Sequence, residues 1–162
     1  MDLEILAGKV GEALKQRSLT LTIAESCTGG WVAQTVTSVP GSSDWFDRGF
    51  VTYTDLSKHE LLGVTLETLS RHGAVSEQTA RAMAEGALVF SHAQVALAVT
   101  GIAGPAGGTA AKPVGSVWVA WALINRDTIS ISHVFTGNRE AIRRQAVTAA
   151  IEGLIRFIES HP

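Results

Sequence analysis

The sequence predicts an α/β domain in which a mixed β-sheet lies between layers of helices. Apolar segments of strand length alternate with amphipathic segments of helix length through the first two thirds of the chain. Two β-rich runs then follow each other directly, and a long amphipathic segment closes the chain. Alternating elements are typical of parallel strands covered by helices, whereas consecutive strands indicate an antiparallel pair.

Five elements are expected in the first part of the chain. Apolar residues from Leu3 to Leu14 recur at helical spacing, β-branched residues mark the strands, and Pro40-Gly41 and Gly63 end helices. Asp55 is the expected cap of the third helix. The elements are, in order, a helix over residues 2–17, a strand over 19–24, a helix over 28–38, a strand over 46–53 and a helix over 55–62.

The middle of the chain predicts a helix, a buried strand and a long loop. Ser76 and Gln78 open a helix that runs to about Phe90. Residues 94–100 form a nearly continuous apolar run, as expected of an interior strand. A glycine-rich loop over 101–112 follows, and a loop of that length inside a compact domain is often functional.

The last part of the chain predicts a hairpin and a helix. Strands are expected over 114–124 and 128–135, and the short separation by Asn125-Arg126-Asp127 indicates an antiparallel pair. Asn138 is the expected cap of the final helix. The apolar stripe of that helix consists of Ile142, Val147, Ala150, Ile151, Leu154 and Ile158.

Composition bounds the class of protein. The 162 residues fit a single domain, 1–162, and 46% hydrophobic with 17% charged residues indicates a globular chain. The formal net charge of −2 argues against nucleic acid as the partner, and no apolar run reaches membrane-spanning length. Cys27 is the one cysteine, so no intramolecular disulfide forms, which suits a reducing, cytoplasmic location.

The segment Thr22 to Gly30 carries the strongest local signal. A small hydroxyl residue, Ser26, lies where a strand passes into a helix, beside Thr28, Gly29 and Gly30. Unpaired N–H groups at a helix N-terminus can hold an anion or stabilise an oxyanion beside a nucleophile. The alternative is that Ser26 or Thr28 only caps the helix.

Two further residues could join Ser26 at one edge of the sheet. Tyr53 and Lys58 lie at and just after the end of the second strand. Ligands bind outside the carboxyl ends of parallel strands, so these residues are expected near Ser26. Lys58 could be the general base if burial lowers its pKa towards roughly 7–8. The alternatives are a solvated lysine and a half-buried tyrosine, and nothing assigns a catalytic task to Glu25.

Cys27 and the glycine-rich loop are weaker candidates. A thiol at a helix N-terminus can be reactive, although a small buried side chain is the preferred interpretation of Cys27. Thr100, Gly101 and Gly104 open a loop whose backbone could approach a ligand. The loop matches neither a Walker sequence nor Gly-x-Gly-x-x-Gly, so a plain connector is the alternative.

Cationic residues suggest where a phosphate could bind. Arg143 and Arg144 lie one turn after Gly137-Asn138-Arg139, near a helix N-terminus where an anion would be favourable. A solvated charged face is the alternative, and Lys112 is a second phosphate candidate. None of the five histidines has metal-ligand spacing with a carboxylate or cysteine, so no metal site and no Ser-His-Asp triad is expected.

A series of motifs in one order makes the chain resemble a known family. The residues are Ala24 to Gly30, Gly49 to Tyr53 with Lys58, Leu62-Gly63-Val64, Gly73 to Glu77, Thr100 to Pro105, Lys112 to Gly115, Phe135-Thr136-Gly137 with Arg139, and Arg143-Arg144-Gln145. They resemble the CinA C-terminal domain family, and within it the stand-alone nicotinamide-nucleotide amidohydrolases. The resemblance covers nearly the whole chain. Ala106 and Asn138 depart from the residues that many relatives carry.

The resemblance implies a fold, a reaction and a site. The fold is a three-layer α/β/α sandwich with a five-stranded, mixed and mostly parallel sheet. The reaction is hydrolysis of nicotinamide mononucleotide to nicotinate mononucleotide and ammonia, without metal or organic cofactor. A serine nucleophile assisted by lysine and tyrosine maps onto Ser26, Lys58 and Tyr53. A homodimer or larger homo-oligomer is also implied, and Trp31, Trp45 and Phe46 are expected to be exposed and available for its interface.

The mechanism expected from these residues has Ser26 attacking the carboxamide carbon while Lys58 takes its proton and Tyr53 bridges the two. Backbone N–H groups near Thr28 to Gly30, or in the Gly101 loop, would stabilise the oxyanion. Two alternatives stay open, a non-catalytic module that binds pyridine nucleotides and a Ser-Lys hydrolase of another amide or ester. The residues expected to bind substrate are Cys27, Thr28, Gly29, Gly30, Thr100, Gly101, Gly104, Arg143 and Arg144.

Overall fold

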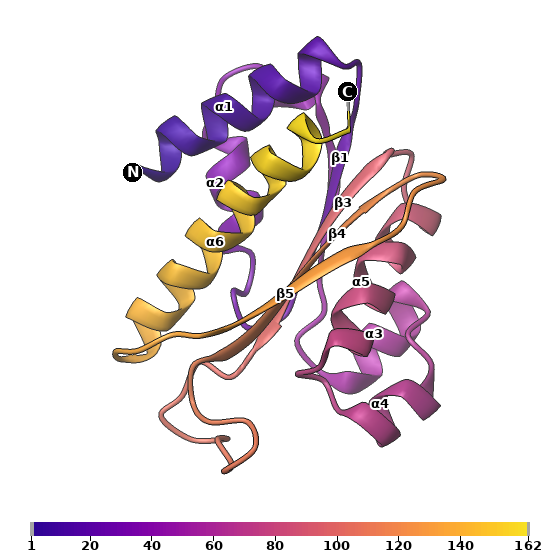
Figure 1. Ribbon diagram of the computed structural model, residues 1–162. Coiled ribbons are helices and arrows are strands. Elements are labelled where there is room, and N and C mark those ends of the chain that lie inside the picture. Colours follow the sequence, from indigo (N-terminus) through magenta and orange to yellow (C-terminus); the bar gives the residue numbers. More distant parts are fainter. Residues whose placement is uncertain (1, 162) are drawn as a thin grey trace.

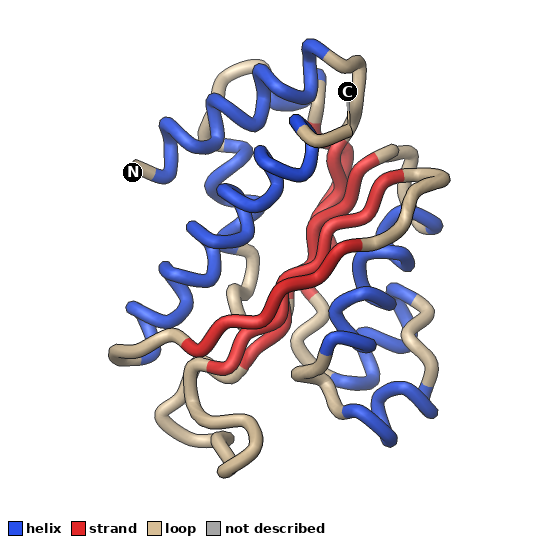
Figure 2. Tube along the Cα trace, viewed as in Figure 1, coloured by secondary structure: helices blue, strands red, loops and turns tan. Residues whose placement is uncertain are grey.

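A five-stranded sheet with strand order β2-β1-β3-β4-β5 separates two layers of helices in the computed structural model, which describes residues 2–161 (Figures 1 and 2). The strands are β1 (Leu21–Glu25), β2 (Phe46–Val51), β3 (Val95–Gly101), β4 (Ser116–Leu123) and β5 (Ile129–Val134). The helices are α1 (Leu3–Gln16), α2 (Trp31–Thr37), α3 (Asp55–Leu62), α4 (Leu66–His72), α5 (Glu77–Val89) and α6 (Arg139–Glu159), with a 3₁₀ turn at Ser42–Asp44.

The sheet is mixed, and four of its five strands run in one direction. β1 pairs in parallel with β2 and β3, whereas β4 pairs antiparallel with both β3 and β5. β4 alone is therefore reversed. The central strands β1 and β3 are buried on both faces, which explains their nearly continuous apolar sequences. The predicted three-layer sandwich with a mixed, mostly parallel sheet is confirmed.

Each face of the sheet carries its own apolar cluster. Helices α1, α2 and α6 cover one face, where large side chains such as Leu14, Trp45 and Ile151 pack together, and all six residues of the predicted α6 stripe are buried. The other face, under α5, is rich in alanine, including Ala84, Ala98 and others. Small side chains there let α5 lie close to the strands.

Four local expectations are corrected by the structure. Helix α4 was not expected, the cap of α3 is Thr54 rather than Asp55, and α2 begins only at Trp31. Gly29 and Gly30 precede α2 with φ of +58° and +104°, in the left-handed region, so the helix cannot start at residue 28. Trp45 is 1% exposed, whereas Trp31 and Phe46 are partly buried against the same cluster, so the expectation of three exposed aromatic residues was wrong.

The topology brings the candidate residues to one edge of the sheet. The carboxyl ends of β1, β2 and β3 point the same way, towards the lower end of the molecule in Figure 1. Ser26, Thr52 and Ile102 directly follow these strands. Within residues 2–161 the structure contains no helix that is both long and apolar enough to cross a membrane.

Candidate active site

Ser26 lies at the end of the central strand β1, where its geometry is tightly fixed. Its N–H donates to the carbonyl of Val99 at 3.0 Å, so the pairing with β3 extends one residue beyond the strand. The chain then turns, and the N–H of Gly29 donates to the carbonyl of Ser26 at 3.1 Å. Ser26 is only 7% exposed, which places its hydroxyl at the bottom of a cavity rather than on the surface.

Glu25 holds the turn that carries Ser26. Its carboxylate is buried, and Oε1 accepts hydrogen bonds from Thr28 Oγ1 at 2.6 Å, Val32 N at 2.9 Å and Gly30 N at 3.2 Å. Oε2 accepts from Ala33 N at 3.0 Å. The carboxylate thus occupies the N-terminus of α2, where a helix favours an anion. No catalytic task was expected of Glu25, and a glutamate just ahead of a helix is the signal in the sequence that points to this orienting role.

Lys58 is the immediate partner of Ser26. Helix α3 begins after Thr54, whose hydroxyl accepts from Ser57 N, and this capping fixes the first turn that carries Lys58. Lys58 Nζ lies 2.9 Å from Ser26 Oγ and donates to the buried carbonyl of Thr52 at 2.8 Å.

The environment of Lys58 favours its neutral form. The residue is 1% exposed, and no carboxylate of residues 2–161 forms an ion pair with it. Burial lowers the pKa of Lys58 below its ordinary value of 10.5, against the smaller raising influence of Asp55 and Cys27. A neutral amine with one N–H on a carbonyl can accept the Ser26 proton.

Tyr53 lies near this pair but does not bridge it. The side chain is 58% exposed, and its hydroxyl accepts a hydrogen bond from Arg139 Nη2 at 2.9 Å. No hydrogen bond joins Tyr53 to Ser26 or Lys58. Lys58 instead contacts Ser26 directly. The expected bridging role of Tyr53 is therefore absent from this geometry, and its place is on the wall of the cavity.

Cys27 does not have the character of a reactive thiol. It is buried, and burial raises the pKa of its thiol to about 12. The neighbouring Glu25 carboxylate also raises the pKa, whereas Arg143 and Lys58 lower it. At neutral pH the thiol stays protonated, so the preferred interpretation as a small buried side chain is supported.

A cavity of about 220 Å³ opens above Ser26 and contains six of the predicted site residues. Four other lining residues were not in the predicted set, and Arg139 among them is the most polar. Its Nη1 donates to Gly104 O at 2.8 Å, so one guanidinium joins the glycine loop to Tyr53. The lining residues are Ser26, Cys27, Tyr53, Lys58, Ala74, Val75, Thr100, Gly101, Ala103 and Arg139.

The other predicted substrate-binding residues lie around the cavity rather than on its wall. Arg143 donates from Nε to Cys27 O at 3.0 Å and from Nη2 to Thr28 O at 3.2 Å, so it supports the turn from outside. The guanidinium of Arg144 lies 5.1 Å from the centre of the Trp31 ring. Arg139, four residues ahead of Arg143, takes the position at the cavity that was predicted for these two arginines.

Backbone donors near Ser26 are fewer than the sequence indicated. The N–H groups of Gly29 and Gly30 already donate to Ser26 O and Glu25 Oε1. The N–H groups of Cys27, Thr28 and Ala103 donate to no other residue in the described part of the chain. These three amides are available as donors to an oxyanion. Across residues 2–161, no group of three His, Cys, Asp or Glu side chains is placed to hold a metal ion.

Comparison with known proteins gives consistent results. Residues 3–158 match the family model described as the CinA C-terminal domain. The chain is 51% identical over 149 residues to the nicotinamide-nucleotide amidohydrolase PncC of Escherichia coli, covering 92% of this chain and 90% of that protein. It is 48% identical over 152 residues to the protein of the same name from Pseudomonas putida, covering 94% of each.

Solved structures agree with the sequence comparison. The competence/damage inducible protein CihA of Agrobacterium tumefaciens superimposes with a TM-score of 0.93 at 46% identity, covering 96% of this chain and 95% of that one. The competence damage-inducible protein A of Klebsiella pneumoniae gives a TM-score of 0.96 at 36% identity over the full length of both chains.

Proposed function

We propose that Ser26 is the nucleophile and Lys58 the general base of this chain, which belongs to the CinA C-terminal domain family and is a nicotinamide-nucleotide amidohydrolase. The reaction converts nicotinamide mononucleotide and water to nicotinate mononucleotide and ammonia. One observation carries the assignment of roles: a buried lysine, which forms no ion pair with any carboxylate of residues 2–161, lies 2.9 Å from a serine hydroxyl at the end of the central parallel strand.

The first half of the proposed mechanism forms an acyl-enzyme. Ser26 Oγ attacks the carboxamide carbon while its proton passes to Lys58 Nζ, and the amide C=O becomes a tetrahedral oxyanion. The amides of Cys27, Thr28 and Ala103 are among the donors available to stabilise that charge. Protonated Lys58 then gives its proton to the leaving nitrogen, the C–N bond breaks, and ammonia departs.

The second half regenerates the serine. Water attacks the ester carbon, Lys58 takes one proton from it, and collapse of the second tetrahedral intermediate returns a proton to Ser26 Oγ. The hydrogen bond from Lys58 Nζ to Thr52 O holds the amine on the serine throughout both halves. Every proton taken from serine or water is passed on, so the scheme needs no further reactant.

Tyr53 and Arg139 have a supporting part in this proposal. Arg139 fixes the Tyr53 hydroxyl and the carbonyl of Gly104, and both residues line the cavity. We place them beside the pyridine ring and ribose of the substrate, in the cavity that Thr100 and Gly101 also line. Arg143 acts indirectly. Its N–H groups donate to Cys27 O and Thr28 O, so it supports the turn that follows Ser26.

The experiment is ammonia release from nicotinamide mononucleotide by the wild type, Ser26→Ala, Lys58→Ala and Cys27→Ala. We expect release by the wild type, loss of at least about a thousandfold in kcat for the first two variants, and modest change for Cys27→Ala. Normal turnover by Ser26→Ala would refute the serine mechanism. Binding without turnover by the wild type would favour the pyridine-nucleotide-binding module, and profiling of other amides and esters tests the third alternative.

Assembly and location complete the proposal. The family resemblance favours a homodimer or larger assembly, and exposed apolar side chains such as Val51, Leu56 and Leu61 are candidates for its interface. Light scattering on the purified protein tests this state. A cytoplasmic location suits the single, buried Cys27, which forms no disulfide.

A further inference from the structure

A second cavity of about 200 Å³ lies beside the cavity above Ser26, which we call the reaction cavity. Val75 lines both cavities. Their walls also come from neighbouring strands, because Gly101 of β3 lines the first cavity and its register partner Val117 of β4 lines the second. The two cavities therefore lie side by side at one edge of the sheet, with Val75 between them.

The volume of the reaction cavity is too small to enclose the whole nucleotide. Pockets that enclose a small organic ligand typically have roughly 300–1,000 Å³. The reaction cavity has about 220 Å³, which is small for a pyridine ring, a ribose and a phosphate together. With the carboxamide at Ser26, the phosphorylated end of the nucleotide must leave this cavity.

The second cavity has the chemistry of an anion subsite. Lys112 lines it, together with the exposed hydroxyl of Ser132 and the partly exposed indole of Trp118. An ammonium group carries three N–H donors, and Lys112 uses one of them on His72 O at 2.8 Å. Two donors and the full charge remain, because no carboxylate of residues 2–161 forms an ion pair with Lys112.

Lys112 is also held in place before any ligand arrives. Its partner His72 O lies at the C-terminal end of α4, where helix carbonyls attract a cation. Gly73 follows with φ of +78°, and a Cβ at that position would lie 3.4 Å from Lys112 Nζ. The ammonium thus sits at a fixed point between α4 and the cavity, so little conformational entropy is lost on binding.

The arginines near the site already donate hydrogen bonds to oxygens of the protein. Both terminal nitrogens of Arg139 donate to Gly104 O and Tyr53 Oη, and Arg143 donates to Cys27 O and Thr28 O. Burial and the nearby Arg156 lower the pKa of His133, which also lines the second cavity, so it adds no charge there at neutral pH. Among the described residues that line the second cavity, Lys112 is the only lysine or arginine, so it supplies the positive charge there.

We propose that the second cavity is the phosphate subsite of the enzyme, with Lys112 as the residue that distinguishes a nucleotide from its riboside. This inference rests on the proposed function, since it places the carboxamide at Ser26. The substrate lies across Val75, with its ring in the first cavity and its phosphate beside Lys112 and Ser132.

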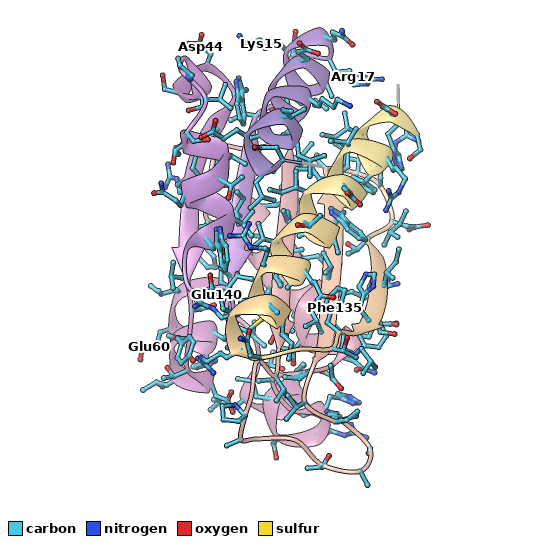
Figure 3. The ribbon with its side chains drawn as sticks, turned by 90° about the vertical axis from the view of Figure 1, so that its left-hand side faces the viewer. Lys15, Arg17, Asp44, Glu60, Phe135 and Glu140 are labelled. Atoms are coloured by element: carbon cyan, nitrogen blue, oxygen red, sulfur yellow. The ribbon has the colours of Figure 1, made fainter. Side chains whose placement is uncertain are left out.

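The test measures binding by calorimetry in a Ser26→Ala background, which removes turnover. Nicotinamide mononucleotide and nicotinamide riboside are titrated into this parent and into the parent carrying Lys112→Gln, Lys112→Arg or Arg139→Gln. Gln keeps an N–H for His72 O but removes the charge, whereas Arg keeps the charge. Lys15→Gln is the matched control, because Lys15 lies at the opposite end of the molecule (Figure 3).

We expect Lys112→Gln to weaken binding of the mononucleotide by about 10- to 100-fold and that of the riboside by less than about twofold. Lys112→Arg should stay close to the parent, and Lys15→Gln should equal it. If Lys112→Gln leaves the difference in affinity between mononucleotide and riboside unchanged, the proposal is overturned. It is also overturned if that difference in affinity is lost in Arg139→Gln alone.

The binding test of the phosphate subsite and the activity test of the proposed function can fail independently. If the wild type releases no ammonia while Lys112 still discriminates between the ligands, the subsite stands and the amidohydrolase mechanism falls. If the wild type is active and the discrimination ignores Lys112, the mechanism stands and the subsite falls.

Discussion

Glu25 supplies the anion that the start of helix α2 favours. The sequence suggested that this helix N-terminus could hold a ligand or an oxyanion, but four donors already point at the Glu25 carboxylate. The next residue along the chain is Ser26, so the same contacts that satisfy the helix also fix the nucleophile. Two of the donors are the amides of Val32 and Ala33 in the first turn of α2.

We predict that Glu25→Leu loses both stability and activity, whereas Glu25→Gln loses less of each. Leucine leaves buried N–H groups without acceptors, which costs about 3 kcal/mol or more in the free energy of unfolding. Glutamine keeps one oxygen for the three donors on Oε1 but presents an amide to Ala33 N. Urea unfolding and kcat of the two variants check this order. Equal behaviour of the two variants would show that the carboxylate is not needed.

The protonation of Lys58 should appear in the pH dependence of the reaction. The base must be neutral, and burial lowers its pKa below the ordinary 10.5. We therefore expect kcat/KM to rise with pH and to level off clearly below pH 10.5. The initial rate of ammonia release between pH 6 and pH 10 gives the profile. A rise that continues without levelling to pH 10 would mean that the lysine is not perturbed.

The same pKa shift predicts a change in stability with pH. Between the folded pKa and 10.5, the unfolded chain binds a proton at Lys58 that the folded chain does not bind. The free energy of unfolding contributed by this site therefore rises with pH across that window. The wild type should gain stability relative to Lys58→Met when urea unfolding is moved from pH 7 to pH 10. A constant difference would contradict the shift.

Single residues differed in how far sequence reasoning could place them. Ser26 and Lys58 were predicted because strand ends converge in a parallel sheet, and the structure brings them together. Tyr53 lines the same cavity as predicted but does not bridge Ser26 and Lys58, because side chains alternate where β2 ends, so that Thr52 is buried and Tyr53 is exposed. Arg139 and Arg143 lie one helical turn apart, and only the packing of α6 decides which of them reaches the cavity.

At the level of elements, long periodic segments were predictable and one short helix was not. The strands and the helices α1, α3, α5 and α6 were expected at nearly the observed positions. Helix α4 was missed because it has seven residues and only Leu69 is buried. Its formation depends on the Thr65 cap and on packing against α5, which a sequence pattern does not reveal.

Two glycines in helices should respond in opposite ways to alanine. A Cβ at Gly86 in α5 would overlap Leu62 O, where α3 ends, so Gly86→Ala must push the helices apart. We expect it to lower the free energy of unfolding by about 2 kcal/mol or more. Among the described residues none lies within 4 Å of such a Cβ at Gly8 in α1, so Gly8→Ala should stabilise by about 0.5–1 kcal/mol. Thermal unfolding of both variants measures the contrast, and destabilisation by Gly8→Ala would contradict it.

At the scale of the molecule, both helical layers depend on the same sheet. Trp45 and Trp121 belong to the cluster under α1, α2 and α6, whereas Trp118 packs against the cluster under α5. Since β1, β3 and β4 contribute to both clusters, neither layer has a complete core without the other.

We therefore predict that the chain unfolds as one cooperative unit, as expected of a single domain. Tryptophan fluorescence reports mainly the packing of the two clusters, and far-ultraviolet circular dichroism reports the helices. Urea transitions followed by the two signals should coincide. Separate midpoints would show that one layer unfolds first and would contradict the single-domain prediction for residues 1–162.

The direction of α6 has a practical consequence. The helix starts with Arg139 at the reaction cavity and ends with Glu159 at the opposite end of the molecule, close to the C-terminus (Figure 1). A protein coupled to a solid support through a tag after its last residue would present its cavity to the passing solution. The fold is thus suited to use as an immobilised catalyst, because the attachment point and the cavity lie near opposite ends of α6.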